Sequence, residues 1–181
     1  MDIKNYTLSK IQALNLPTSN STAILAKLRR AIGTPISEAP NTWEFLLQDM
    51  PRKDERFTNA VYVTLCLYAL HRQGKEDDVN GDINFATAIS KIRTTENASG
   101  ILRRFNAVAT ATDFSELAYH ARGLVQLLKS HDEKMNYPQF ANDLLHFQNP
   151  KYKNEIMLKW GQDFYRIPQP EDKISEENEL I

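Results

Sequence analysis

The sequence has little cysteine and little glycine. It contains one cysteine, Cys66, and 6 glycines among 181 residues. A lone cysteine excludes an intramolecular disulfide, and the apolar neighbours of Cys66 predict a buried structural thiol. Scarce glycine and few β-branched runs favour helix over sheet. No apolar stretch approaches the ~20 residues of a membrane helix, and no apolar signal segment opens the chain. We therefore expect a cytoplasmic protein with no membrane contact.

The short motifs of common enzyme classes are also missing. The chain has no phosphate-binding glycine loop, dinucleotide-binding turn, zinc-ligand spacing or nucleophile turn. We therefore expect no cofactor, no resident metal and no enzymatic activity. One catalytic alternative is a metal-dependent phosphohydrolase. The metal ligands of that class are a His-Asp pair with one histidine before it and one aspartate after it, and the sequence contains residues in this order. These residues are His131 and Asp132, His71 or His120, and Asp143 or Asp163. The pair falls where a predicted helix ends, which disfavours a rigid metal site.

The hydrophobic pattern has the period of an α-helix along most of the chain. The composition, 41% hydrophobic and 25% charged, is that of a globular domain, and no segment alternates with a period of two. We predict an all-α fold of seven to eight helices, forming one compact bundle or two small lobes. The longest segment, 54–73, is apolar nearly all round and should be the central helix. The other predicted helices lie near 22–32, 43–47, 83–93, 98–110, 113–130, 137–147 and 152–166, and the weakly patterned N-terminal segment contains at most a short helix around 8–14.

Charge is distributed unevenly along the chain. The formal net charge is −1, but residues 168–181 carry five acidic side chains and one lysine, which is −4. Residues 1–167 therefore carry +3. We predict that 1–167 form a single helical domain and that 168–181 form a disordered acidic tail.

Two predicted helices carry basic doublets, in which Arg103 and Arg30 point away from the apolar stripe while Arg104 and Arg29 lie on its flanks. Arg103 and Arg104 follow Ile101-Leu102, and Arg29 and Arg30 follow Leu28. Arginine forks suit planar contact with phosphate or carboxylate, so these helices should hold an anion. Further candidate contacts are the basic residues that begin the central helix and those on the polar side of the last helix. They are Arg52, Lys53 and Arg56, and Lys151, Lys153 and Lys159.

Four segments in this order resemble the CasB family, the small subunit of the type I-E CRISPR surveillance complex, Cascade. The resemblance spans about residues 22–166, and each segment alone is a weak motif. The segments are AKLRRA at 26–31, CLYALH at 66–71, LRRFNA at 102–107 and LKWGQDFY at 158–165.

The resemblance implies a non-catalytic, all-helical, DNA- and RNA-binding protein of antiviral defence. Its implied partners are the target DNA, the crRNA–DNA hybrid, the backbone and large subunits of Cascade, and a second copy of itself. Its implied role is to hold the target and displaced strands and so stabilise the R-loop. By position, the basic sites of the family fall at Arg29, Arg30, Arg103 and Arg104, at Arg56 or Arg52, and at Lys151 or Lys153.

One segment departs from the family pattern. Around residues 85–88 the family would carry glycine with a basic residue, but Thr87 supplies neither, so Lys91 or Arg93 would have to replace that contact. The principal alternative function is a helical protein–protein adaptor whose arginines pair with acidic partners and never touch nucleic acid.

Overall fold

The computed structural model describes residues 1–51 and 54–166. Within these residues the chain forms nine α-helices, two short 3₁₀ turns and one isolated β-bridge, Asn80 to Met135. The all-α prediction is confirmed, with more helices than the seven to eight expected. The predicted tail, 168–181, and the basic pair Arg52-Lys53 lie outside the described residues. The helices are α1 (Ile3–Asn15), α2 (Ser19–Arg30), α3 (Trp43–Leu47), α4 (Glu55–Arg72), α5 (Phe85–Lys91), α6 (Ala98–Ala109), α7 (Phe114–Ser130), α8 (Tyr137–Phe147) and α9 (Pro150–Tyr165).

Helix α4 occupies the middle of the molecule, as its apolar sequence predicts. It packs against α1 and α2 on one side and against α7 and α8 on the other. Eleven of its residues are buried, and Cys66 is among them. Asp54 caps its first turn by accepting from the Phe57 backbone N–H at 3.1 Å. Gly74, at φ 76°, follows its last turn.

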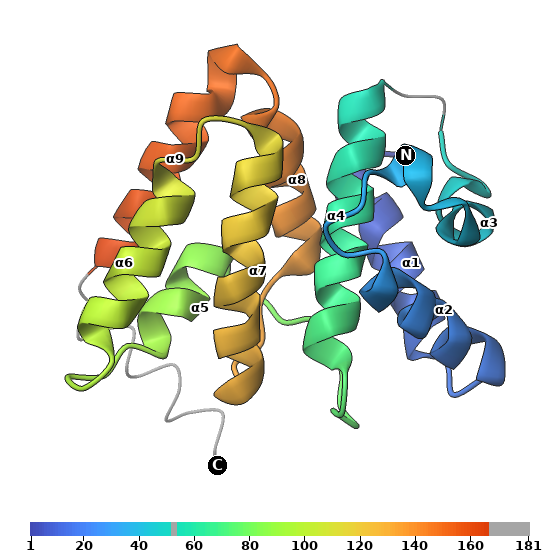
Figure 1. Cartoon of the computed structure of the whole chain (residues 1–181), viewed down its shortest axis with the longest axis horizontal. Helices are drawn as coiled ribbons and strands as arrows, with labels where there is room; N and C mark the ends of the chain where they lie inside the picture. Colours follow the sequence, from blue (N-terminus) through green and yellow to red (C-terminus); the bar gives the residue numbers. More distant parts are fainter. Residues whose placement is uncertain (52–53, 167–181) are drawn as a thin grey trace.

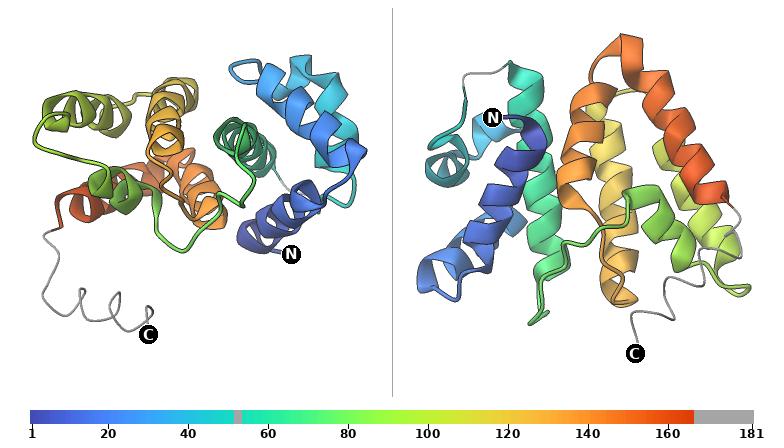
Figure 2. Two further views of the ribbon diagram at one scale, coloured as in Figure 1. Left: turned by 90° about the horizontal axis from the view of Figure 1, so that it is seen from below. Right: turned by 180° about the vertical axis from the view of Figure 1, so that it is seen from behind.

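The long helices form two layers. The front layer contains α6, α7, α4 and α2 in that order, and α9, α5, α8 and α1 lie behind it (Figures 1 and 2). Helix α6 packs on both α7 and α9. Its Phe105 ring stacks on Phe164 of α9, with ring centroids 3.9 Å apart. This contact buries the apolar stripe of α6 and leaves its polar side facing outward.

Three helices begin earlier than predicted. Helix α9 begins at Pro150, two residues before the predicted start, because proline is well suited to a first turn. Helix α2 begins at Ser19 under a Thr18 cap. Helix α1 begins at Ile3, capped by Asp2. Among the described residues, no helix is long and apolar enough to cross a membrane.

Candidate nucleic-acid interface

Helix α6 presents the basic doublet as its sequence predicts. Ile101, Phe105 and Val108 are buried, and Arg103 and Arg104 are exposed. Helical spacing places the two arginines away from the buried stripe. Their outward orientation is therefore confirmed.

A groove of about 380 Å³ lies between α6 and α7. Its lining includes both residues of the doublet and a third arginine, Arg122 of α7, but no acidic side chain. Three guanidinium groups around one groove concentrate positive charge, which attracts anions such as phosphate. The lining residues are Arg103, Arg104, Ala107, Tyr119, His120, Arg122, Gly123 and Gln126.

Arg122 was missed in the sequence, although a signal for it was present. The buried stripe of α7 includes Leu117, Leu124 and Leu128. On the opposite side, residues spaced three or four apart form what we call the outward stripe of α7. It consists of Tyr119, Arg122, Gln126 and Lys129.

The outward stripe runs from the groove toward the C-terminal end of α7. Burial lowers the pKa of its last member, Lys129, and the charges of Lys75 and Arg29 lower it further, so positive charges gather at this end of the helix. Arg30, next to Arg29, is exposed. Helix α4 lies between α7 and α2 and packs on both of them (Figure 1).

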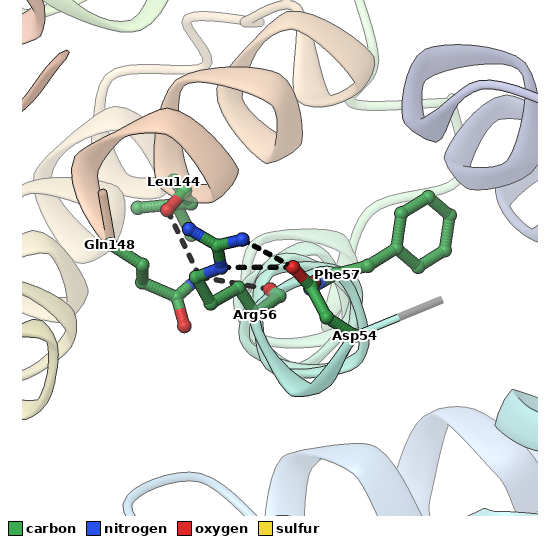
Figure 3. A network of polar contacts seen from close by, with 5 residues as sticks. All are labelled: Asp54, Arg56, Phe57, Leu144 and Gln148. Atoms are coloured by element: carbon green, nitrogen blue, oxygen red, sulfur yellow. Dashed lines mark hydrogen bonds and ion pairs between the residues drawn. The ribbon is translucent and has the colours of Figure 1, made fainter. Parts of the chain in front are cut away.

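Arg56 lies at the start of α4, away from the groove, and is already paired. Its guanidinium meets the Asp54 carboxylate at 2.5 Å, and its backbone carbonyl accepts from Gln148 Nε2 at 2.9 Å (Figure 3). A basic side chain at a helix N-terminus opposes the helix dipole, and the capping carboxylate of Asp54 compensates the charge of Arg56 there.

The three lysines of α9 also lie outside the groove. Lys153 donates to the Thr112 carbonyl at 2.5 Å, and its ammonium lies 5.0 Å from the centre of the Phe147 ring. Lys159 lies 3.7 Å from the carboxylate of Asp143. Lys151 is exposed, with its ammonium 5.3 Å from the neighbouring Tyr152 ring. Lys153 and Lys159 therefore have structural contacts that the sequence pattern did not indicate.

The residues of the phosphohydrolase pattern have other partners. His71 is buried, and its Nδ1 lies 2.9 Å from the Tyr137 hydroxyl. Asp132 forms an ion pair with Lys75. No group of three histidine, cysteine or acidic side chains in the described part of the chain is arranged to hold a metal ion. Burial also raises the pKa of the Cys66 thiol to about 12, so this group is a poor nucleophile.

The sequence matches the family model for CRISPR-associated protein Cse2 over residues 24–165. CasB from Thermobifida fusca is 23% identical, with a TM-score of 0.74, and the match covers 91% of this chain and 96% of that one. CasB from Thermus thermophilus is 20% identical, with a TM-score of 0.74 and coverages of 91% and 99%. A chain of a CRISPR RNA-guided surveillance complex is 17% identical, with a TM-score of 0.77 and coverages of 91% and 94%. No curated protein sequence matches the chain. At these identities the solved structures establish a shared fold.

Proposed function

Because this chain belongs to the CRISPR-associated Cse2 family, which includes the CasB proteins, we propose that it is a non-catalytic subunit of a type I-E CRISPR surveillance complex, Cascade. Its role is to hold nucleic-acid strands by their phosphates. Its partners in this role are the target DNA, the crRNA–DNA hybrid, the backbone and large subunits, and a second copy of itself. The observation that carries the proposal is the α6–α7 groove, with three arginines and no acidic side chain in its lining.

Phosphate contacts fit what such a subunit has to supply. Arginine forks bind phosphate oxygens without reading the bases. In an RNA-guided complex, pairing with the guide reads the sequence instead. Exchange of a DNA duplex for an RNA–DNA hybrid is nearly balanced in free energy, so modest contacts to the backbone can tip it.

The existing contacts of each basic residue rank the candidates. Arg103, Arg104 and Arg122 line one groove, where Arg104 makes a long hydrogen bond, 3.4 Å, to the Gly100 carbonyl of its own helix. We place Arg29 and Arg30 with them, because Lys129 at the end of the outward stripe lies near Arg29. These five arginines are the strand-holding set in our proposal. Arg56, Lys153 and Lys159 are held by other groups of the protein. They rank lower, because binding a phosphate would first require them to leave those partners.

The proposal is tested by replacing Arg103 and Arg104 with alanine and titrating the full chain with labelled single-stranded DNA at several salt concentrations. Each phosphate contact to a single strand contributes roughly −0.7 to the log–log salt slope. Loss of two contacts should therefore weaken binding and make the slope shallower by about 1.4. A matched control replaces Lys4 of α1 and Lys134, which precedes α8, with alanine; both lysines are exposed and lie outside the groove.

The adaptor function makes the opposite prediction. If the arginines pair only with acidic protein partners, the double variant and the control should show the same weak binding to DNA. The double variant should then lose association with other Cascade subunits, and added polynucleotide should not compete. That combination would contradict a strand-holding role.

A further inference from the structure

Tyr119 is exposed to solvent beside the arginines of the α6–α7 groove. With 73% of its surface exposed, it is the most exposed large apolar side chain in the described residues. Its ring meets the His120 ring edge-on, with centroids 5.2 Å apart. Within the described part of the chain, its hydroxyl has no hydrogen-bond partner. Packing in the folded chain therefore does not account for a tyrosine at this position.

The ring stands between two hollows of the surface. It lines the α6–α7 groove and also a cleft of about 470 Å³ bounded by α4, α7 and residues 31–37. Arg122 lines both as well. Tyr119 and Arg122 are three residues apart on α7, a rise of about 4.5 Å along the helix axis. An aromatic ring and a guanidinium group at this separation are close enough to engage neighbouring parts of one strand.

Proteins that bind single-stranded nucleic acids combine an exposed aromatic ring with nearby cationic side chains. The phosphates bind the cations, and an unpaired base stacks on the ring, whichever base it is. A base inside a duplex is already stacked on its neighbours and cannot offer its face. The lack of acidic residues in the groove lining disfavours a basic peptide as the ligand.

We propose that the α6–α7 groove binds a single strand, with Tyr119 stacking on one unpaired base while Arg103, Arg104 and Arg122 hold adjacent phosphates. The inference rests on the proposed function and deepens it. It assigns one side chain to a base and three to phosphates. Recognition is still independent of sequence, because stacking on a tyrosine discriminates weakly between bases.

The test compares a short single-stranded oligonucleotide with an abasic strand of the same length, which keeps the phosphates and lacks the bases. Fluorescence anisotropy at fixed low salt should show the full chain binding the base-containing strand roughly tenfold tighter. Tyr119→Leu should bind both strands with about the same affinity. Tyr119→Phe should keep the preference, since the ring remains. Tyr165→Leu removes another exposed tyrosine, on α9, and should also keep it.

Two results would overturn the inference. In the first, the unmodified chain binds both strands with equal affinity, and the double variant with Arg103→Ala and Arg104→Ala binds both more weakly. The groove then binds phosphates alone, and the proposed function stands without the stacking. In the second, Tyr119→Leu lowers the affinity for both strands equally, or changes only the self-association of the chain. Tyr119 would then contribute to packing or to a protein–protein contact. Absence of salt-dependent binding to either strand would instead contradict the proposed function itself.

Discussion

Basic residues of this protein differ in what they already touch. Arg103 and Arg122 face a groove, and the structure pairs neither with a carboxylate in the described residues. Lys159 lies by a buried carboxylate, and Lys153 donates to a backbone carbonyl. A charge with a partner inside the protein contributes less to ligand binding, because the partner must be exchanged. This difference follows from neighbours in space, and helical position alone does not reveal it.

His71 makes stability depend on pH. Burial, helped by the charges of Lys75 and Lys129 and opposed by Asp132, lowers its pKa from the ordinary 6.5 to about 4. In the unfolded chain the imidazole takes up a proton below about 6.5, whereas in the folded protein it stays neutral to about 4. Between these values the unfolded state binds more protons, so stability falls as pH falls.

We therefore expect His71→Gln to lose less stability than the unmodified chain between pH 7 and pH 5. The amide can still bond the Tyr137 hydroxyl but does not titrate. The difference in the free energy of unfolding should be about 2 kcal/mol at most, measured by urea denaturation at both pH values. Parallel losses in the two proteins would show that His71 is not the titrating group.

Single buried polar contacts join the helices to one another. Asp143 of α8 is 1% exposed. Its carboxylate accepts from the Trp160 indole of α9 at 2.8 Å and from Gln139 at 2.7 Å. Lys159 lies 3.7 Å away and balances the charge. These contacts join α8 to α9 at the point where Trp160 enters the core.

Asp143→Ala should lower the free energy of unfolding by about 1–3 kcal/mol, because the buried indole N–H loses its acceptor. Asp143→Asn should lower the free energy of unfolding by less, since the amide oxygen can still accept the hydrogen bond from the Trp160 indole N–H. Asp82→Ala, at an exposed loop position, is the control and should change stability by less than about 0.5 kcal/mol. Chemical denaturation measures all three. Equal effects of Asp143→Ala and Asp82→Ala would show that Asp143 does not join α8 and α9.

The molecule as a whole separates its charges. Residues 168–181 carry −4 and the rest of the chain +3. The acidic segment lies outside the described residues. A charge acts on a polyanion within about 10 Å of it at ordinary salt. The net charge of −1 therefore conceals a basic helical body.

Deletion of residues 168–181 should raise the affinity for single-stranded DNA several-fold at low salt, with a smaller effect at high salt, because screening shortens the field. Anisotropy titrations at two salt concentrations measure this. A second variant, with Glu176, Glu177 and Glu179 replaced by glutamine, keeps the length and should reproduce part of the gain. Unchanged affinity in both would mean that the acidic segment does not oppose binding.

The sequence determined the helices and the direction of their faces. The apolar stripe of α6 and the outward position of Arg103 and Arg104 follow from a 3.6-residue period, which is a local property of the chain. The cap of α7 is equally local, because the Asp113 carboxylate accepts from the Glu116 N–H three residues later, at 2.9 Å. The order of four segments also predicted the family correctly.

Only the tertiary structure decided which outward residues share a site. Arg122 joins Arg103 and Arg104 because α7 packs beside α6, and Lys159 is held by Asp143 because α9 packs on α8. Local spacing sets which way a side chain points from its own helix. Which groups from different helices meet depends on how buried side chains interlock across the core, and no single segment contains that information.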